Sequence, residues 1–347
     1  MSRPPLRRGL GMRLRFFLPF VVSGIFLLLL ANSLRGQADQ LSSALASADW
    51  RWIVPAIALY FLGTFLRSVR WGQLLPDQHV TIPTLFKALV VGFTINNLLP
   101  LRMGEVARAY LLARWGRVAY ATTVASLIVE RILDGLSLAA LLLVAIWLLP
   151  DAPGYLLAVG IIAGLGFLTG AVLMALAAWR ASTLIALVTF CVRWVPSRFG
   201  PPIVRAAESF TRALAMVHHP ARLARVLVLS IVAWCSELGL FFALMFSLGI
   251  AGTYPRALLV GSAANFATLL PSSPGYAGTF DAALARAAQD SLAISAGLAG
   301  AYDIVVHATL FLPVVVVGTL VLWRSRLTFD QVTRTPQSEY PAYSPRT

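Results

Sequence analysis

Charged residues are scarce in this sequence of 347 residues, where they make up 12%, against roughly a quarter in an average soluble protein. Hydrophobic residues make up 59%, and the mean hydropathy is +0.79. A surface that faces lipid needs no charge, whereas a surface that faces water does. The composition therefore excludes a water-soluble enzyme, a disordered chain and a nucleic-acid-binding domain, and it favours a protein that crosses a membrane several times.

Cysteine and lysine are almost absent. Cys191 and Cys235 lie in apolar runs and there are only four histidines, so the sequence indicates neither a disulfide framework nor a structural zinc site. Lys87 is the only lysine, and the other 27 basic residues are arginines that give a net charge of +14. No glycine-rich loop ending in Lys-Ser or Lys-Thr is present to bind ATP. We expect no metal ion and no cofactor.

Six apolar runs reach the roughly 20 residues that a membrane-spanning helix needs. They lie at 16–34, 52–71, 119–149, 155–178, 226–249 and 299–323. Two further apolar segments, 85–100 and 257–271, are shorter, and each ends in Leu-Leu-Pro. Short apolar segments stopped by proline are typical of re-entrant hairpins or broken helices. We therefore expect an all-α polytopic membrane protein with about six full transmembrane helices plus two re-entrant broken-helix segments.

The arginine distribution predicts an orientation, because cytoplasmic loops are enriched in basic residues. Residues 1–15 contain five arginines, so we expect a cytoplasmic N-terminus and a retained helix at 16–34 rather than a cleaved signal peptide. The first short segment is expected to enter from the cytoplasm and return there, because both of its flanks are basic. The basic residues on these flanks are Arg67, Arg70, Lys87, Arg102, Arg108, Arg114 and Arg117.

The stretch 181–225 divides the apolar runs into two groups. Six arginines at 193–225 face the single acidic residue Glu208, which predicts interfacial amphipathic helices on the cytoplasmic side. Arg324 and Arg326 also predict a cytoplasmic C-terminus. We expect one transmembrane domain over 16–325, followed by a polar tail at 326–347.

The two short segments resemble each other. Four features recur in the same order, at offsets of 169 and then 171 residues: Ala88–Gly92 with Ala257–Gly261, Asn96 with Asn265, Leu98–Pro100 with Leu269–Pro271, and Gly104 with Gly275. The apolar pentapeptide alone would be weak evidence, since its residues recur in any membrane chain. The asparagine and the Leu-Leu-Pro motif favour an inverted repeat with halves at roughly 50–150 and 220–323, an arrangement of many transporters whose substrate binds near the midplane.

The first polar cluster follows the first Leu-Leu-Pro motif. Glu105 and Arg108 are three residues apart and share a helical face, and Arg102 precedes them. A helix broken by proline and glycine opens backbone N–H groups toward an anion. The cluster predicts a phosphate receptor, and the alternative is a cytoplasmic loop whose arginines only set the orientation.

The second polar cluster lies in the middle of the run at 119–149. Glu130 and Asp134 are four residues apart on one face, and Arg131 is placed to pair with Asp134. Two carboxylates and one arginine leave a net negative charge, which Arg102 or Arg108 would neutralise. A structural salt bridge between helices is the alternative, but charges at this depth rarely face lipid, which favours a polar cavity.

Three further residues are candidates for a proton relay. Glu237 lies in mid-span with no local partner, so it must meet one from another helix or be protonated. Asp303 and His307 are four residues apart in the last run and form either a relay or a plain hydrogen-bonded pair.

The segment 271–278 follows the second Leu-Leu-Pro motif. Its small residues, among them Ser272 and Ser273, either leave backbone groups free for a ligand or allow a tight turn, and Asp281 follows it. A Ser–His hydrolase would use one of these serines with His307, but no Gly-x-Ser-Gly is present. An aspartyl intramembrane protease lacks its Gly-x-Gly-Asp element. We therefore predict no catalytic residues.

Three segments resemble motifs of the flippase-like lysylphosphatidylglycerol synthase transmembrane-region family. Residues 97–108 resemble its P-x-R-x-G-E-x-x-R motif, 129–134 its E-R-x-x-D motif, and 270–281 its P-x-S-P-G-G-x-G-x-x-E motif. Tyr276 replaces a glycine of the third motif, and Asp281 replaces its glutamate. No aminoacyl-transferase domain, which follows the membrane half in multiple peptide resistance factors, is expected here.

The resemblance implies an inner-membrane protein that moves an amphipathic lipid with a charged headgroup: an aminoacylated phospholipid, a hopanoid or a polyprenyl-linked intermediate. In this hypothesis Arg102 and Arg108 hold the anionic group. Glu105, Glu130 and Asp134 hold cationic groups and orient the arginines. Asn96 and Asn265 satisfy the broken backbone, and 271–278 forms an opposing gate. The alternatives are a lipid-modifying enzyme and a non-transporting lipid-binding partner of a biosynthetic complex. We expect no nucleic-acid partner, and either a homodimer or a biosynthetic partner protein.

Overall fold

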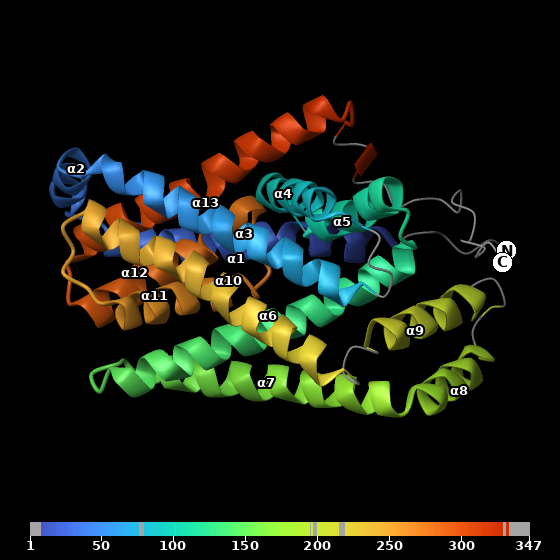
Figure 1. Ribbon diagram of the computed structural model, residues 1–347. Coiled ribbons are helices and arrows are strands. Elements are labelled where there is room, and N and C mark those ends of the chain that lie inside the picture. Colours follow the sequence, from blue (N-terminus) through green and yellow to red (C-terminus); the bar gives the residue numbers. More distant parts are fainter. Residues whose placement is uncertain are drawn as a thin grey trace, which may run out of the picture.

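All the regular elements that the structure describes are helices (Figure 1). The computed structural model describes residues 8–75, 80–100, 102–194, 196, 200–214, 219–328 and 331–332. These residues form thirteen α-helices, α1 to α13, and the single 3₁₀ turns η1 (Trp50–Trp52) and η3 (Pro274–Tyr276). The predicted all-α class is confirmed.

Five helices are long and apolar enough to cross a membrane by themselves. They are α3 (Ile53–Leu74, continuous with η1), α6 (Tyr120–Leu148), α7 (Gly154–Trp179), α10 (Pro220–Ser247) and α13 (Ala296–Arg324). Helix α1 (Arg8–Ser33) meets the same criterion only together with α2 (Ala38–Ala46), from which it is bent by 90°. The expected polytopic membrane protein is confirmed, with five spans or, counting the bent pair, six.

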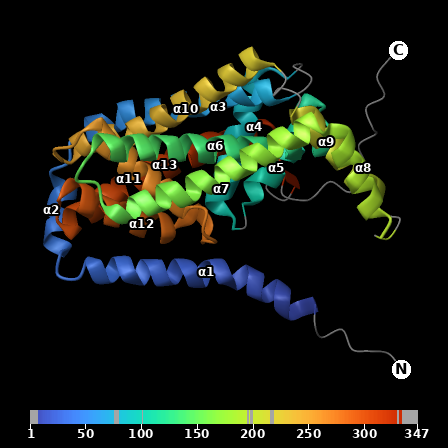
Figure 2. The same ribbon diagram turned by 90° about the horizontal axis from the view of Figure 1, so that it is seen from below.

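The spans differ in how much of their surface faces outward. The most apolar stretch of α10 is 61% buried inside the protein, whereas that of α7 is only 11% buried. Helix α1 packs mainly on α12 and lies apart from the rest of the bundle (Figure 2). The apolar side chains of α1 and α7 therefore cover the lipid-facing side, and α10 belongs to the centre.

The first short apolar segment folds back as a helical hairpin. Helix α4 (Ile82–Leu98) and helix α5 (Met103–Gly116) pack against each other, and Val80 contacts Gly116 at the open end of the hairpin. Proline cannot continue a helix, so α4 stops at the Leu-Leu-Pro motif. At Gly104 a Cβ atom would lie 1.9 Å from the carbonyl oxygen of Gly92, so only glycine allows the two helices to approach this closely.

The second short apolar segment forms a matching hairpin from α11 (Tyr254–Ala267) and α12 (Thr279–Leu292). Its tip contains η3, and Gly275 and Gly278 have φ angles of 69° and 92°. Glycine adopts this left-handed region without steric penalty. Tyr276 has a φ of 61°, a value that a residue with a large side chain rarely adopts. The small residues of this tip allow a tight turn.

The order of elements repeats along the chain. A long helix, a hairpin and a second long helix follow one another as α3–α6 and again as α10–α13. The two hairpins lie toward opposite ends of the molecule, with α4 and α5 in the right half of Figure 1 and α11 and α12 in the left half. This is the arrangement that an inverted repeat predicts.

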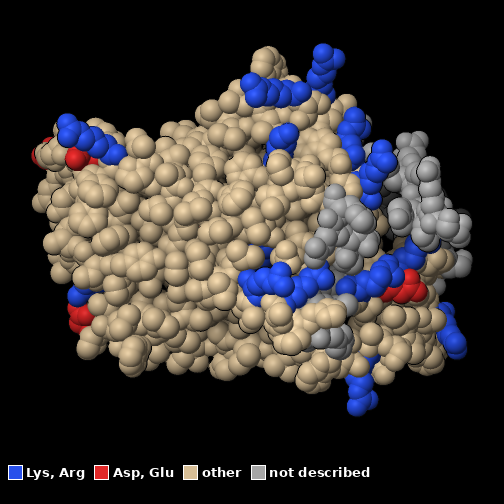
Figure 3. Space-filling model, in the orientation of Figure 1, with Lys and Arg blue, Asp and Glu red and all other residues tan. Residues whose placement is uncertain are grey.

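The end that holds α8 (Ala181–Val192) and α9 (Gly200–Leu214) is rich in arginine (Figure 3). Helix α8 has 12 residues, too few to span, and α9 exposes Arg205 and Arg212 while burying Leu214. Helix α9 has the amphipathic character expected of an interfacial helix, whereas α8 is apolar on all its sides. The assignment of this end to the cytoplasm stays a prediction.

At the opposite end, a short loop joins α6 to α7. Asp151 in this loop accepts a hydrogen bond of 2.6 Å from Arg256 at the start of α11. This hydrogen bond holds the pKa of the Asp151 carboxyl below its usual value. The loop thereby ties the open end of the second hairpin to the first half of the chain.

Single cysteines at the open ends of the hairpins test their direction. In a variant without the native cysteines, Thr81→Cys and Arg114→Cys flank the first hairpin, and Thr253→Cys and Ala293→Cys flank the second. We expect a membrane-impermeant maleimide to label the first pair from one side of sealed vesicles and the second pair only from the other. Labelling of Thr81→Cys and Arg114→Cys from opposite sides would show that the first segment crosses the membrane.

Candidate functional site

Buried charged side chains gather where α3, α5, α6 and α10 meet. On α3 and on α6 the two charged positions are three or four residues apart, so that they share one inward face. Each of these side chains belongs to a residue that is less than a tenth exposed. An ionisable group in the bilayer centre costs about 3 kcal/mol or more, so each requires a partner. The residues are Arg67, Arg70, Arg108, Glu130, Asp134 and Glu237.

A chain of ion pairs joins three of these helices. Arg70 of α3 donates a 2.5 Å hydrogen bond to Asp134 of α6, and its guanidinium lies 3.8 Å from Glu130. Arg108 of α5 binds Glu130 through two hydrogen bonds of 2.9 and 2.7 Å. Trp234 of α10 donates to Asp134 at 3.1 Å. Two arginines therefore neutralise the two carboxylates of α6, and the Arg108–Glu130 pair has the strong bidentate geometry.

A second ion pair, between Arg67 of α3 and Glu237 of α10, connects the two halves of the chain. The Arg67 guanidinium also lies 4.5 Å from the ring centroid of Trp234, and that of Arg108 lies 4.2 Å from the ring of Trp71. Tryptophan faces attract cations, so these rings offset part of the cost of removing the arginines from water. Glu237 has no partner on its own helix, and Arg67 of α3 is its partner in the structure.

The sequence-based interpretation of Arg67 and Arg70 as orientation signals is wrong. They are 4% and 0% exposed, respectively, and face α6 and α10 instead of water. The sequence does indicate that Arg67 faces the protein interior. Polar and aromatic residues recur at helical spacing in this apolar run, at Tyr60, Thr64, Arg67 and Trp71. Arginines within such a run are functional or structural by default.

The spacing along the helix predicted that Arg131 pairs with Asp134, and this prediction is wrong. Arg131 donates two hydrogen bonds, of 3.0 and 2.6 Å, to Glu105 of α5. The carboxylate of Asp134 is instead paired with Arg70 of α3, at 2.5 Å. The side chains of Arg131 and Glu105 are 39% and 32% exposed, so this pair, unlike the others, is accessible to a ligand.

The tips of the two hairpins touch in the middle of the protein. The Arg102 guanidinium donates a 2.7 Å hydrogen bond to the carbonyl oxygen of Thr268, just after α11. Asn96 accepts a 2.8 Å hydrogen bond from the Gly104 N–H, which satisfies the broken backbone of the first hairpin as expected. Asn265 instead donates to the Gly261 carbonyl within its own helix, at 2.9 Å.

A cavity of about 300 Å³ lies between these tips and the buried ion pairs. Part of its wall is polar, with Asn96, Arg102, Arg131 and Asn265, and part is aromatic. The aromatic residues are Tyr60, Phe93, Phe167, Trp234, Phe266, Tyr276, Phe280 and Phe311. The volume is at the small end of the range for small-molecule sites, so the cavity fits a headgroup and not a whole lipid.

Arg102 is the arginine of this site that has no carboxylate partner within the described part of the chain. The site contains Arg67, Arg70, Arg102, Arg108 and Arg131 against Glu105, Glu130, Asp134 and Glu237. Every other arginine in this set is bound to a carboxylate. The recorded bond of Arg102 goes to a neutral carbonyl, which leaves one uncompensated positive charge on the cavity wall.

The remaining predicted site residues lie in or next to the second hairpin. Ser272 is partly buried in the tip, and Ser273 bonds the backbone of its own loop and Ser23 of α1. Asp281 contacts His307, which lines the cavity, whereas Asp281 itself lies behind it. His307 therefore pairs with Asp281 and not with Asp303, because the tip places Asp281 nearer. Glu237 is part of the ion-pair network instead.

Comparisons with known proteins give a consistent answer. Residues 16–318 match a family model described as the lysylphosphatidylglycerol synthase TM region. A UPF0104 membrane protein of Methanothermobacter thermautotrophicus is 33% identical over 128 residues, which are 34% of this chain and 37% of that protein. Glycosyltransferase AglD of Haloferax volcanii is 25% identical over 300 residues, which are 76% of this chain and 47% of AglD.

A UPF0104 membrane protein of Pyrococcus horikoshii is 22% identical over 306 residues, which cover 81% of this chain and 89% of that protein. The chain thus spans less than half the length of the first two relatives and most of the third.

The Arg67–Glu237 pair predicts a specific pattern of stability. We expect Glu237→Gln to lower the free energy of unfolding by about 3 kcal/mol or more, because it leaves a buried guanidinium without its carboxylate. Arg67→Met combined with Glu237→Leu should be less destabilising than Glu237→Gln, since it removes both charges. Thermal unfolding in detergent measures both effects.

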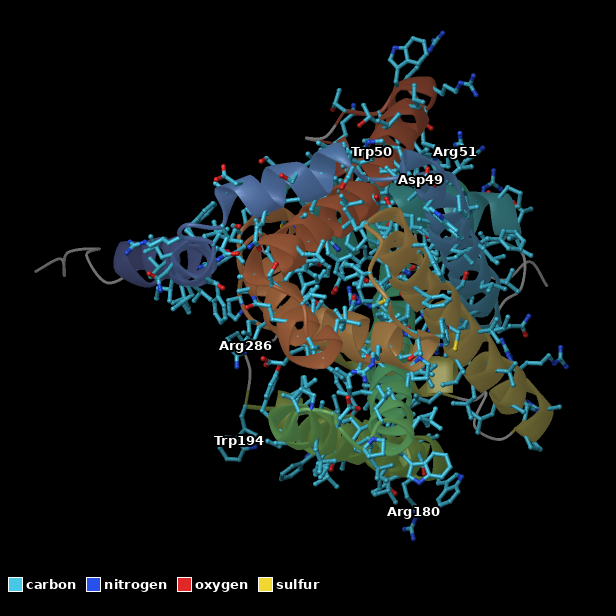
Figure 4. All side chains as sticks on the ribbon, turned by 90° about the vertical axis from the view of Figure 1, so that its left-hand side faces the viewer. Asp49, Trp50, Arg51, Arg180, Trp194 and Arg286 are labelled. Atoms are coloured by element: carbon cyan, nitrogen blue, oxygen red, sulfur yellow. The ribbon has the colours of Figure 1, made fainter. Side chains whose placement is uncertain are left out.

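Arg286→Gln is the control for these variants. Arg286 points away from the bundle in Figure 4 and forms an exposed pair with Asp290, which contributes at most about 0.5 kcal/mol. Equal thermal stability of Glu237→Gln and Arg286→Gln would contradict a structural role for the buried pair.

Proposed function

This chain belongs to the lysylphosphatidylglycerol synthase transmembrane-region family, and on that premise we propose that it translocates a lipid with an anionic headgroup across the membrane. The observation that carries the proposal is the unpaired Arg102 on the wall of a cavity between two opposed hairpin tips. Transporters built from inverted repeats bind their substrates near the midplane, at broken helices.

The headgroup phosphate binds Arg102 in this proposal, with Arg131 beside it. A guanidinium offers several N–H donors in a fork that matches a phosphate, and Arg102 uses one of its nitrogens for Thr268. Arg131 also faces the cavity and is held by Glu105. Arg102 thus offers one positive charge that no carboxylate of the described residues neutralises, which fits a phosphodiester with its one negative charge.

The roles expected for the acidic residues change accordingly. Glu105, Glu130 and Asp134 were expected to hold cationic groups of the lipid as well as to orient the arginines. All three are bound to arginines of the protein, so we assign them the second role alone. Arg108 is likewise removed from headgroup binding, because both of its bonds go to Glu130 and it lies outside the cavity wall.

The acyl chains stay outside the cavity in this proposal, because about 300 Å³ cannot hold them. Phe167 of α7 and Phe311 of α13 give the cavity an apolar wall on the side of these two helices. An apolar wall of this kind lets a lipid keep its chains in the bilayer while its headgroup crosses through protein.

A lipid-modifying enzyme is the second candidate, and the name of the relative AglD is the observation that favours it. AglD is called a glycosyltransferase, but the match covers 47% of its length. The two functions differ in a simple observable. An enzyme would convert a labelled lipid in detergent, whereas a translocator would leave the lipid chemically unchanged.

The decisive experiment measures lipid movement in proteoliposomes that contain fluorescent phosphatidylglycerol in both leaflets. A membrane-impermeant quencher reports how fast lipid from the inner leaflet reaches the outer one. We expect the unmodified protein to accelerate this exchange. Arg102→Ala should slow it about 10- to 100-fold, because a hydrogen bond between charged groups contributes about 1.5–3 kcal/mol.

Arg114→Ala is the matched control, since Arg114 is exposed at the end of α5 and does not line the cavity. It should exchange lipid at the rate of the unmodified protein. The proposal is wrong if the unmodified protein moves no anionic lipid, or if Arg102→Ala moves it equally fast.

A further inference from the structure

We propose that Asp281, Asp303 and His307 form a proton-binding site that controls the tip of the second hairpin. The coupling of this proton-binding site to lipid movement rests on the function proposed above. The site joins α12 to α13 on the side of the cavity opposite the buried ion pairs. A proton is its ligand, and the hairpin tip is the element that responds.

The geometry centres on Asp281, in the first turn of α12. One of its carboxylate oxygens contacts Nδ1 of His307, and the other accepts a 2.7 Å hydrogen bond from the Gly278 N–H. Asp281 is 6% exposed. Both oxygens of this carboxylate are therefore engaged, one by a titratable ring and the other by the backbone of the tip.

Asp303 adds a second carboxyl group that has no cation beside it. It is 4% exposed, and its Oδ1 has no hydrogen-bond partner among the described residues. Asp281 is the charged neighbour that acts on this carboxyl group. Two buried carboxylates that act on each other repel when both are ionised, so a proton held between them stabilises the pair.

Among the described residues, no arginine or lysine forms an ion pair with Asp281 or Asp303. The ionisable groups that neighbouring elements present toward this side of the cavity are Tyr60 and Arg67 of α3, Arg102 before α5, Glu130, Arg131 and Asp134 of α6, Glu237 of α10 and Tyr276 of the tip. Of the arginines, Arg67 and Arg131 are bound to Glu237 and Glu105, and Arg102 is bound to Thr268.

On the other sides, the charged groups of the described residues are paired or exposed: Arg256 of α11 binds Asp151, and Lys87 of α4 is exposed. On α12, Arg286 and Asp290 pair with each other at the surface. On α13, Tyr302 donates its hydroxyl hydrogen to the Phe241 carbonyl of α10. Residues 18–33 of α1, the helix against α12, contain no charged side chain, and Asp39 of α2 is exposed.

His307 provides the route between this pair and the cavity. Its side chain is 23% exposed and lines the cavity, with its ring between Phe280 and Phe311. An imidazole ring carries one nitrogen that donates and one that accepts, so it can pass a proton from the cavity to Asp281. Asp303, which does not line the cavity, exchanges its proton through Asp281.

The tip responds because Asp281 holds it. The bond from Gly278 fixes the start of α12, and Gly278 packs directly on the backbone of Ser23 in α1. The Ser273 N–H donates a 2.7 Å hydrogen bond to the Ser23 hydroxyl. Protonation of Asp281 weakens its acceptance of the Gly278 N–H. The proton thereby biases the loop that carries Gly275 and Tyr276 into the cavity wall.

A sodium ion is a poorer ligand than a proton for this site. Both oxygens of Asp281 are engaged, which leaves Oδ1 of Asp303 as the free carboxylate oxygen. A hard cation requires several oxygen ligands. Within the described residues, no group of three or more His, Cys, Asp or Glu is arranged to hold a metal ion.

Two measurements test the site, and the first needs no transport. In a variant without the native cysteines, Ser272→Cys reports access to the tip through its rate of maleimide labelling, corrected for thiol ionisation with a free thiol. We expect the corrected rate to change at least threefold between about pH 5.5 and 8.5. Adding Asp303→Asn or His307→Gln should flatten this profile, whereas Asp290→Asn should not. Dependence on sodium at fixed pH, or a flat profile for Ser272→Cys alone, would overturn the proposal.

The second measurement is lipid exchange in proteoliposomes over the same pH range. We expect the unmodified protein to show a pH-dependent rate, and Asp303→Asn to show a rate that no longer depends on pH. If no lipid moves at any pH while labelling still follows pH, the proposed function fails and the proton site stands. If lipid moves but both proteins have the same pH profile, the proton site fails and the proposed function stands.

Discussion

The structure depends on one constraint: the charges inside the bundle must neutralise one another without water. Arg70 and Arg108 meet Glu130 and Asp134, and Arg67 meets Glu237, so that α3, α5, α6 and α10 are held in a single relative position. Removing one charge would leave another unpaired in a medium of low dielectric constant, and this makes the arrangement cooperative. The cavity keeps its shape because this scaffold forms one of its walls.

The main features of the fold could be predicted from the sequence, because spans and breaks are local properties. Apolar length defines the long helices, and Leu-Leu-Pro defines where α4 and α11 stop. The hairpin helix α12 and the short α2 were not predicted, since their mixed residues carry neither a long apolar run nor a repeat. Their positions depend on packing against α1, α11 and α13, which no single segment encodes.

Site residues could be predicted better than their partners. Arg102, Glu130, Arg131 and Asp134 were singled out because they are polar in apolar surroundings, and they line the cavity. The expected neighbours at helical spacing were wrong for Arg131 and for His307, since a residue across a helix interface lay closer than a residue one turn away. Spacing along a helix identifies a shared face, but which residue opposes that face is decided by tertiary structure.

Arg102 combines two features: it forms no ion pair with a carboxylate among the described residues, and it bridges the two hairpin tips through the Thr268 carbonyl. A phosphate that reaches this guanidinium competes with that carbonyl for the same donors. In the function proposed above, the residue that recognises the headgroup therefore also holds the two hairpin tips together. Headgroup binding is then the event that separates the tips.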